Sequence, residues 1–333
     1  MLRASVTIAT WKRRDLLEKL LNLLLDQTIP RYQYEIIVCD SGSADGTDEM
    51  MQDFCNLHSN LIYIGNAPNI LAAKRNAGIR RASAPIVIFM DDDVIPVRGF
   101  IEAHLNAHQG RAGVVFSGNV RFPEEWVRRS NYFHFRDSRH IGPGRPDIDF
   151  RDVPFKNLVV MNLSFKKAEV LDRVGFVSEE FIGYGSEDTE FGYRIWKAGL
   201  KIEFNEKALV YHYEHGGSID GFVKKMYHTS RDSMPNLQRL APGCMEYTKA
   251  KLLEPITDND GLINKIKKSV LRVFMYKKFF GAVKSYLKWT DGRPVFYNPY
   301  LFRYLSACAY LYGCEDRKLV EGKKVSVAKG WFT

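Results

Sequence analysis

Short apolar segments alternate with amphipathic helical segments over residues 5–90, and this alternation limits the chain to a small group of folds. The predicted strands are residues 5–10, 34–39, 61–64 and 86–90. The predicted helices are residues 16–27, a segment that opens on Asp48 and Glu49, and residues 72–82. Strands that alternate with helices favour an α/β fold, in which a mostly parallel sheet carries helices on its faces.

The rest of the chain is less regular. We predict a helix at residues 100–108, a strand at 113–120 and a long irregular stretch at 121–157. Further helices at 166–174 and 186–199 and short strands at 201–204 and 208–213 follow, and from residue 221 the pattern is helical. We therefore divide the chain into an α/β domain at residues 1–220, with halves at 1–98 and 99–220, and a mainly helical, basic C-terminal region at residues 221–333.

The excess positive charge is concentrated near the C-terminus. The formal net charge is +9, and residues 262–290 contain eight basic residues and no acidic one. Ile263, Ile266 and Val270 recur among them at helical spacing. A basic amphipathic helix either binds an anionic membrane surface or packs its apolar face on the protein, and the sequence leaves both open. The remainder is nearly neutral and lacks a base-reading module, so we expect no nucleic-acid partner.

We expect a cytoplasmic protein. A strand begins within a few residues of Met1, which leaves no room for a signal peptide. No apolar run reaches the length of about 20 residues that spans a membrane. The five cysteines are scattered without a CxxC pair, which favours reduced thiols over disulfides or a zinc site. Together with the basic segment, these features allow a peripheral position at the inner face of the membrane.

Three consecutive aspartates, Asp91 to Asp93, follow the predicted strand at residues 86–90. Carboxylates at the exit of a buried strand repel one another and lose hydration, so they require compensating positive charge. Ligands of α/β sheets bind at the carboxyl ends of strands. Carboxylate oxygens suit Mn²⁺ or Mg²⁺, which in turn suits a diphosphate. The alternative is an acidic, solvated turn, because Asp is common in turns.

Asp40 closes the second predicted strand and precedes a Ser/Gly turn. A carboxylate and backbone N–H groups at that position suit a base or a ribose. The alternative is an Asx turn that joins the strand to the next helix. The chain has neither a GxGxxG after its first strand nor a GxxxxGK[ST], so the phosphate-binding signatures of dinucleotide-binding enzymes and P-loop proteins are missing.

A second acidic cluster, Glu187 and Asp188, follows Ser186 at the start of a predicted helix. One interpretation is structural, because Ser186 can cap the helix and its dipole favours carboxylates in the first turn. The other is a general base that accepts the proton of an attacking hydroxyl. His212 and His215 follow at the end of a predicted strand, and they become candidate metal ligands because an aspartate cluster already requires a cation.

Six motifs follow one another along the chain: residues 40–47 (DSGSADGT), 72–78 (AAKRNAG), 89–93 (FMDDD), 161–165 (MNLSF), 183–194 (GYGSEDTEFGYR) and 211–212 (YH). In this order the first three resemble the nucleotide-sugar half of family 2 glycosyltransferases of the GT-A fold. The last three resemble the acceptor half, as in bacterial chondroitin-polymerase and galactosyltransferase-type domains. The resemblance covers about residues 4–220 and implies a Rossmann-like sheet, followed here by a C-terminal helical extension. The family often has Trp where this chain has Tyr184, which leaves the donor or acceptor sugar open.

The resemblance implies roles for residues of the first half. Asp40 would bind a uracil-type base of a UDP-sugar donor. Thr10 and Arg13 would line the nucleotide pocket. Lys74 and Arg75 would lie near the diphosphate or the ribose.

It also implies a metal site and a base. Asp93 would ligate the Mn²⁺ or Mg²⁺ ion, Asp91 would contact the ribose or a metal-bound water, and His212 would be a further protein contact to the ion. Asp188 would be the catalytic base, and Glu187 would bind donor or acceptor hydroxyls.

The implied reaction is sugar transfer to a hydroxyl of a glycan or a lipid-linked acceptor, as in polysaccharide biosynthesis. The metal would neutralise the leaving diphosphate, and attack from the opposite face would invert the anomeric centre. With Asp91 and Asp93 as the functional positions, Asp92 is expected to tolerate substitution best. A retaining transferase on the same fold and a non-catalytic carbohydrate-binding or scaffolding derivative remain alternatives. A sugar-phosphate nucleotidyltransferase is disfavoured, because residues 9–13 lack the glycines of that class.

Overall fold

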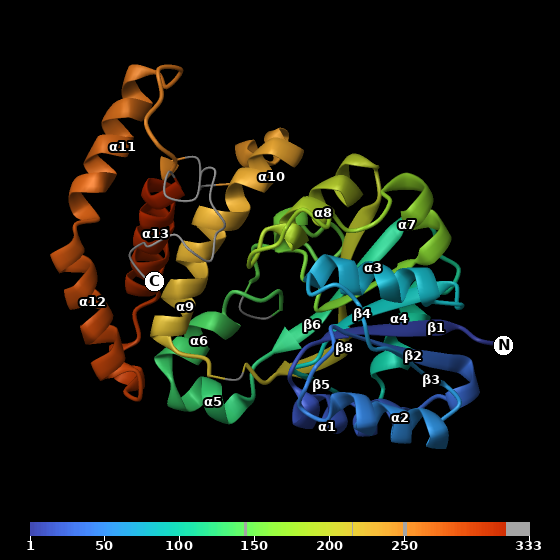
Figure 1. Cartoon of the computed structure of the whole chain (residues 1–333). Helices are drawn as coiled ribbons and strands as arrows, with labels where there is room; N and C mark the ends of the chain where they lie inside the picture. The colour runs from blue at the N-terminus through green and yellow to red at the C-terminus, as the bar shows by residue number, and fades with distance from the viewer. Residues whose placement is uncertain (143–144, 215, 249–251, 318–333) are drawn as a thin grey trace. The chain divides into compact units, whose positions relative to one another are not determined.

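The computed structural model describes residues 1–142, 145–214, 216–248 and 252–317, and the chain forms two compact units (Figure 1). The first unit comprises residues 1–123, 138–179 and 191–215. The second comprises residues 124–137, 180–190 and 216–333. The sheet belongs to the first unit, and the second is helical.

The strands are β1 (Ala4–Thr10), β2 (Tyr34–Asp40), β3 (Leu61–Ile64), β4 (Ile86–Asp91), β5 (Val94–Pro96), β6 (Val114–Arg121), β7 (Asn162–Lys166) and β8 (Lys201–His212). The helices of the first unit are α1 (Arg14–Leu25), η1 (Arg31–Gln33), α2 (Thr47–Leu57), α3 (Leu71–Arg81), α4 (Phe100–His108), η2 (Phe155–Asn157) and α7 (Lys167–Arg173). Helix α8 (Glu187–Lys197) begins in the second unit and ends in the first. The second unit contains α5 (Glu124–Arg129), α6 (Asn131–Asp137), α9 (Ile219–His228), η3 (Thr229–Ser233), α10 (Met234–Leu240), η4 (Pro242–Tyr247), α11 (Leu262–Phe274), α12 (Lys277–Thr290), η6 (Pro294–Phe296) and α13 (Pro299–Asp316).

The sheet has the strand order β3-β2-β1-β4-β7-β6-β8-β5. Strands β3, β2, β1 and β4 pair in parallel, which confirms the α/β fold expected from the alternation of segments. Strand β7 is antiparallel to both β4 and β6, and β8 is parallel to β6. Strands β1, β2, β4, β6 and β8 therefore all run in one direction, and their carboxyl ends lie at the same edge of the sheet.

The side chains of β1 alternate between two packing layers. Val6 and Ile8 belong to the hydrophobic core that also contains the leucines of α1, the methionines of α2 and Phe100 of α4. Thr7 points to the other face, where α3 packs so closely that a Cβ on Gly78 would lie 2.8 Å from the Thr7 Cβ. Helices therefore cover both faces of this part of the sheet (Figure 1), as the sequence predicts.

A buried polar cluster joins α4 to β6, β7 and β8. Asn162 donates from its side-chain nitrogen to the carbonyls of Asn119 (3.2 Å) and Ala208 (2.9 Å). Its oxygen lies 2.9 Å from Nε2 of His104, and the Ser164 hydroxyl lies 2.8 Å from Nδ1 of that histidine. A side chain at position 118 would overlap the Asn162 amide, since a Cβ there would lie 2.2 Å from its oxygen, so glycine is required beside the cluster.

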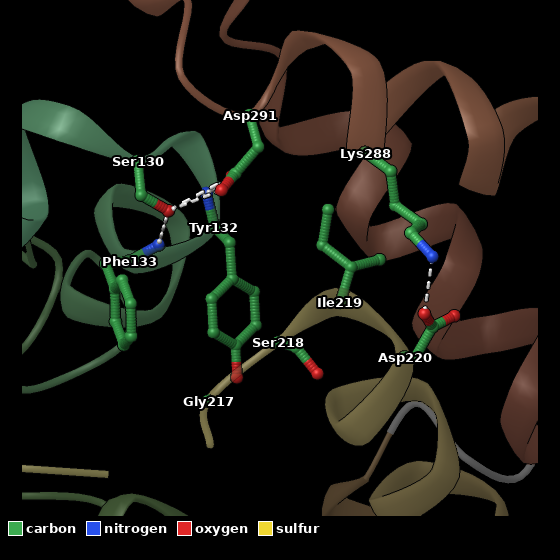
Figure 2. A pocket seen from close by; sticks show the side chains of 9 residues that line it. All are labelled: Ser130, Tyr132, Phe133, Gly217, Ser218, Ile219, Asp220, Lys288 and Asp291. Carbon is green, nitrogen blue, oxygen red and sulfur yellow. Dashed lines mark hydrogen bonds and ion pairs between the residues drawn. The ribbon is translucent and has the colours of Figure 1, made fainter. Parts of the chain in front are cut away.

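The sequence-based assignment differs from the structure in several places. It lacks the strands β5 and β7. The two strands predicted at residues 201–204 and 208–213 are one strand, β8, which ends at His212 and whose register with β6 shifts between Gly118 and Asn119. Residues 121–157 contain α5, α6 and η2 rather than irregular structure alone. The α6 turn is held from far along the chain, because the Asp291 carboxylate accepts from the Ser130 hydroxyl (3.0 Å) and from the Tyr132 N–H (2.8 Å), as Figure 2 shows.

The second unit has a hydrophobic core of its own, built from α6, α9, α12 and α13. The rings of Phe135 and Phe302 stack at 4.8 Å, and α13 approaches α9 so closely that a Cβ on Gly313 would lie 2.4 Å from the Tyr227 carbonyl. A small cavity of about 210 Å³ lies beside Tyr132 and Ile219 (Figure 2). Within the described residues, none of the helices combines the length and the apolar character needed to cross a membrane.

The buried histidines of α4 should make the fold acid-sensitive. Burial lowers the pKa of His104 from 6.5 to about 3 and that of His108 from 6.5 to about 4. Below pH 6.5 the unfolded chain therefore binds more protons than the folded protein does. As the pH is lowered from 6.5 toward about 4, the free energy of unfolding should decrease by about 1.4 kcal/mol per pH unit for each histidine. Urea unfolding at a series of pH values measures this slope.

The double variant His104→Gln/His108→Gln should lose overall stability but flatten the slope between pH 6.5 and about 4. The control His58→Gln, outside this cluster, should keep it. An unchanged slope in the double variant would contradict the assignment.

Candidate active site

The predicted site residues of the first unit gather at the carboxyl edge of the sheet. Thr10 is opposite Asp40 in the β1–β2 register, and Ala9 is opposite Asp91 in the β1–β4 register. The three-residue strand β5 begins directly after Asp93 and pairs Val94 with His212. The Tyr213 N–H donates to the Asp93 carbonyl at 2.8 Å, so backbone pairing holds the end of β8 beside the aspartates.

Arg13 supplies the positive charge that the aspartate triplet requires. Its guanidinium lies 2.6 Å from Oδ1 of Asp92 and 3.0 Å from Oδ2 of Asp93. The other oxygen of Asp93 lies 3.6 Å from Nε2 of His212. The Arg13 side chain is 42% exposed, whereas both carboxylates are largely covered.

The two carboxyl groups differ in their electrostatics. Burial raises the pKa of Asp92 to about 6, although Arg13 opposes the shift. Burial by itself would raise the pKa of Asp93. The hydrogen bond and charge of His212, together with Arg13, outweigh burial and lower the pKa of Asp93 below its ordinary value. Asp92 is 5% exposed, which argues against the expectation that it tolerates substitution best. The sequence gives no signal for its pairing with Arg13, which lies 79 positions away.

Asp91 and the basic residues of α3 form a second part of the cluster. Arg75 donates to Oδ1 of Asp91 at 3.0 Å, and Lys74 donates to the Thr10 carbonyl at 3.0 Å. Both basic side chains are buried. Burial lowers the pKa of Lys74, and the negative charges of Asp92 and Asp40 oppose that shift. Lys74 thus stands between the two strand ends that carry the carboxylates.

Asp40 is fully buried and anchors a turn. Its carboxylate accepts from the Ser43 N–H (2.7 Å), the Ser43 hydroxyl (2.6 Å) and the Tyr63 hydroxyl (3.2 Å). The Ser43 hydroxyl also accepts from the N–H of Lys12, which has a left-handed backbone with φ of 54°. Asp40 therefore holds the turn through the N–H three residues on, rather than the N–H two residues on that defines an Asx turn, and Tyr63 is a partner that the sequence did not suggest.

His212 is the strongest candidate metal ligand beside Asp93. Its ring stacks on Phe122, with centroids 5.2 Å apart, and Phe122 stacks in turn on His140 at 5.5 Å. Nδ1 of His212 is buried and has no hydrogen-bond partner within the described residues. Its other ring nitrogen, Nε2, faces the Asp93 carboxylate, and an imidazole nitrogen with a carboxylate suits a divalent cation. His215 lies outside the described residues.

Among the described residues, two side chains fit a cation, and they do not form a complete set of ligands around it. The described residues contain no cluster of three or more His, Cys, Asp or Glu side chains arranged for a metal. Asp93 lies 3.6 Å from His212, so these two side chains are the pair that would hold the ion, whereas Asp91 pairs with Arg75. Mg²⁺ and Mn²⁺ sites with few protein ligands are usual where a nucleotide's phosphates supply further oxygens.

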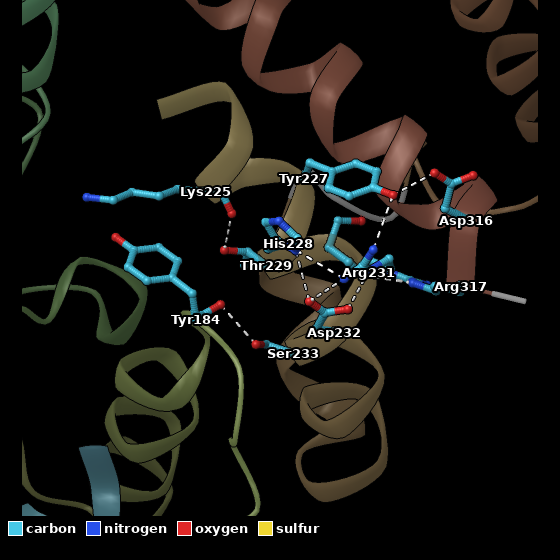
Figure 3. A network of polar contacts seen from close by, with 11 residues as sticks. Tyr184, Lys225, Tyr227, His228, Thr229, Arg231, Asp232, Ser233, Asp316 and Arg317 are labelled. Carbon is cyan, nitrogen blue, oxygen red and sulfur yellow. Dashed lines mark hydrogen bonds and ion pairs between the residues drawn. The ribbon is translucent and has the colours of Figure 1, made fainter. Parts of the chain in front are cut away.

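Glu187 and Asp188 lie in the first turn of α8 and belong to the second unit. Ser186 does not cap this helix with its side chain, since its backbone is left-handed (φ 74°) and its buried hydroxyl has no hydrogen-bond partner among the described residues. The preceding loop is held on the π-helical turn η3 by the Ser233 hydroxyl, which donates to the Tyr184 carbonyl at 2.9 Å (Figure 3). A Cβ on Gly185 would lie 2.9 Å from the Thr229 hydroxyl, so this loop fits closely.

The role of Asp40 as a turn anchor predicts a loss of stability on substitution. Asp40→Asn should lower the free energy of unfolding by about 2 kcal/mol, because the amide nitrogen cannot accept from the N–H and hydroxyl groups that surround it. Ser43→Ala, which removes one of these hydroxyls, should cost about 1 kcal/mol. Urea unfolding checks both values. Wild-type stability of Asp40→Asn would show that the carboxylate is not a structural anchor.

Comparison with known proteins finds two family models that match parts of the chain. Residues 5–166 match glycosyl transferase family 2, and residues 150–216 match the N-terminal domain of galactosyltransferase. The validoxylamine A glucosyltransferase of Streptomyces hygroscopicus subsp. jinggangensis is 30% identical over 227 residues, which are 61% of this chain and 54% of that protein. The chondroitin synthase of Escherichia coli is 29% identical over 245 residues, which are 64% of this chain and 35% of that protein. The match thus spans about half the length of the first relative and about a third of the length of the second.

A solved structure shares the fold. A mannosyltransferase from Pyrobaculum calidifontis, in complex with GDP-Man and Mn²⁺, superposes with a TM-score of 0.55 at 19% identity, covering 92% of this chain and 86% of the other. These matches agree with the order of the sequence motifs and with the carboxylates at the carboxyl edge of the sheet. Residues 5–216 thus match glycosyl transferase family 2 and the N-terminal domain of galactosyltransferase, and the chain has the GT-A fold.

Proposed function

We propose that this protein is a metal-dependent glycosyltransferase that moves a sugar from a nucleotide-diphosphate sugar to an acceptor hydroxyl. The observation that carries the proposal is the cluster at the carboxyl edge of the sheet, where Asp93 lies between Arg13 and His212. A largely covered carboxylate between a guanidinium and an imidazole suits a divalent cation and a diphosphate.

The donor is proposed to be a UDP-sugar. Thr10, Arg13 and Asp40 would line the nucleotide pocket, and Lys74 and Arg75 would lie near the diphosphate or the ribose. Of these, Arg13 is the exposed cation that can turn toward a phosphate, since Lys74 and Arg75 are buried.

The cation is proposed to be Mn²⁺ or Mg²⁺, held by Asp93 and His212, with Asp91 at the ribose or a metal-bound water. When bound, it would neutralise the leaving diphosphate as a Lewis acid. The pairing of β5 with β8, which puts Val94 opposite His212 directly after Asp93, supports this pair as ligands.

Asp188 is proposed as the general base and Glu187 as a ligand of donor or acceptor hydroxyls. Both carboxylates lie in the first turn of α8. A charged Asp188 would accept the proton of the acceptor hydroxyl as its oxygen attacks the anomeric carbon, and the carbon–oxygen bond to the diphosphate would break with inversion.

The acceptor is proposed to be a glycan or a lipid-linked sugar, and the setting the cytoplasm, at the inner face of the membrane. The five cysteines, all within the described residues, are free thiols, and four of them are buried. Free thiols of this kind suit a reducing compartment.

The cation proposal is tested by calorimetric titration of the full chain with UDP and GDP, with Mn²⁺ or with EDTA. Nucleotide affinity should require Mn²⁺, and Asp93→Asn should lower it at least tenfold, or about 1.4 kcal/mol. Asp26→Asn, which changes an exposed carboxylate, is the matched control and should bind as wild type. If neither EDTA nor Asp93→Asn weakens binding, the cation does not hold the nucleotide.

The base proposal is tested by turnover of a panel of UDP- and GDP-sugars. Asp188→Asn should lower the transfer rate by roughly 10²–10⁴-fold without weakening donor binding, because a general base acts in the transition state. Nuclear magnetic resonance of the product reports the anomeric configuration. Retention would replace the inverting mechanism, and nucleotide binding without turnover of any donor would favour a non-catalytic derivative.

A further inference from the structure

Helix α11 presents an apolar stripe to solvent. The stripe consists of Leu262, Ile263, Ile266, Val270, Val273 and Phe274, which are between 49% and 75% exposed. With 3.6 residues per turn, these positions fall on one arc of about 120° of the helix surface. An amphipathic helix of a globular protein normally turns such a stripe toward the core, so this helix is inverted relative to the usual arrangement.

The opposite side of α11 carries its attachment to the rest of the second unit. Lys268 is buried and donates to the Asp260 carboxylate at 2.7 Å and to the Pro255 carbonyl at 3.0 Å. Arg272 donates to the Glu254 carbonyl at 3.2 Å, and Leu271 packs against the helical core. The helix is therefore fixed through polar contacts and one leucine, while its apolar stripe stays uncovered.

Helix α12 continues the same composition. Phe280 and Leu287 are buried in the helical core, whereas Phe279 and Trp289 are 62% and 60% exposed. Asp220 pairs with Lys284 (3.0 Å) and Lys288 (2.7 Å). Exposed aromatic rings beside lysines are typical of side chains that lie at the boundary between lipid headgroups and acyl chains.

The charge of residues 262–290 indicates what kind of partner binds this surface. Residues 262–290 carry eight basic side chains and no acidic one, and Lys265, Lys267 and Lys278 are not the partners of Asp220 or Asp260. A second copy of the chain would bring two such basic segments together, and like charges repel. A nucleic acid would cover the lysines but leave the apolar stripe in water. An anionic bilayer satisfies both the lysines and the stripe.

We propose that the apolar stripe of α11 inserts into the interface of an anionic phospholipid bilayer, together with Lys265 and Lys267 of α11 and Lys278 of α12, and holds the enzyme there as a peripheral membrane protein. The apolar side chains enter the boundary between the lipid headgroups and the acyl chains, and the lysines contact the lipid phosphates. The inference rests on the second unit alone and does not depend on the donor, the cation or the base.

Flotation of the full chain with vesicles tests the proposal. Vesicles of phosphatidylcholine alone are compared with vesicles that also contain phosphatidylglycerol, at low and at high salt. Wild type should bind the anionic vesicles at low salt and be released by salt, because the lysine contribution is screened. Lys265→Gln/Lys267→Gln/Lys278→Gln should lower the partition coefficient roughly a hundredfold. Ile263→Gln/Ile266→Gln/Val273→Gln should lower it at least tenfold.

Two matched controls separate this surface from general charge and apolarity. Lys19→Gln/Lys201→Gln/Lys207→Gln removes three exposed lysines elsewhere, and Leu57→Gln removes a leucine of α2 that is 76% exposed. Both controls should bind vesicles as wild type does, and thermal unfolding should show that every variant is folded. The proposal is overturned by equal binding to neutral and anionic vesicles, or by α11 variants that bind like wild type. It is equally overturned if light scattering shows a dimer that only the stripe variant abolishes, or if oligonucleotides bind more tightly than vesicles.

Discussion

The parallel pairing of β1 with β2 and β4 is the constraint on which the candidate site depends. It aligns Thr10 with Asp40 and Ala9 with Asp91, so residues distant in sequence meet at one edge of the sheet. The same alignment concentrates carboxylates where water is scarce, and their mutual repulsion must be balanced. Arg13, Lys74 and Arg75 provide that balance. The last two can do so because α3 lies close to β1, an approach that requires glycine at position 78.

The fold of the first ninety residues is predictable because its signals are local. Strand β3 and helix α4 have the predicted boundaries, and the other early elements differ by a few residues at their ends. Helices α5 and α6 could not be found this way. They have only six and seven residues, and the carboxylate that holds the start of α6 comes from Asp291, 161 positions away from Ser130. Strand β5, with three residues, is likewise defined by its partner rather than by its own sequence.

The sequence predicts which residues belong to the site better than it predicts which of them are in contact. The motif residues of the first unit do meet at one edge, but the pairing of Arg13 with Asp92 and of Arg75 with Asp91 is a tertiary property. Asn162 illustrates the reverse case. Its motif was associated with an acceptor site, whereas the structure gives it a place in the buried cluster that joins four elements. Ser186, which one interpretation of the sequence makes a helix cap, has a left-handed backbone, a strain more often found at functional positions.

The short strand β5 has a consequence for how this chain can vary. Segments that connect strands at the surface usually accept insertions and deletions. Between Asp93 and Pro96 the chain has no such freedom, because the pairing of Val94 with His212 fixes which side chain of β8 lies beside the aspartates. A slip of one residue would turn the imidazole to the opposite face of the sheet and bring a neighbouring tyrosine, Tyr211 or Tyr213, to its place. Length in this segment is therefore as strictly constrained as residue identity, and natural variation here should consist of substitutions alone.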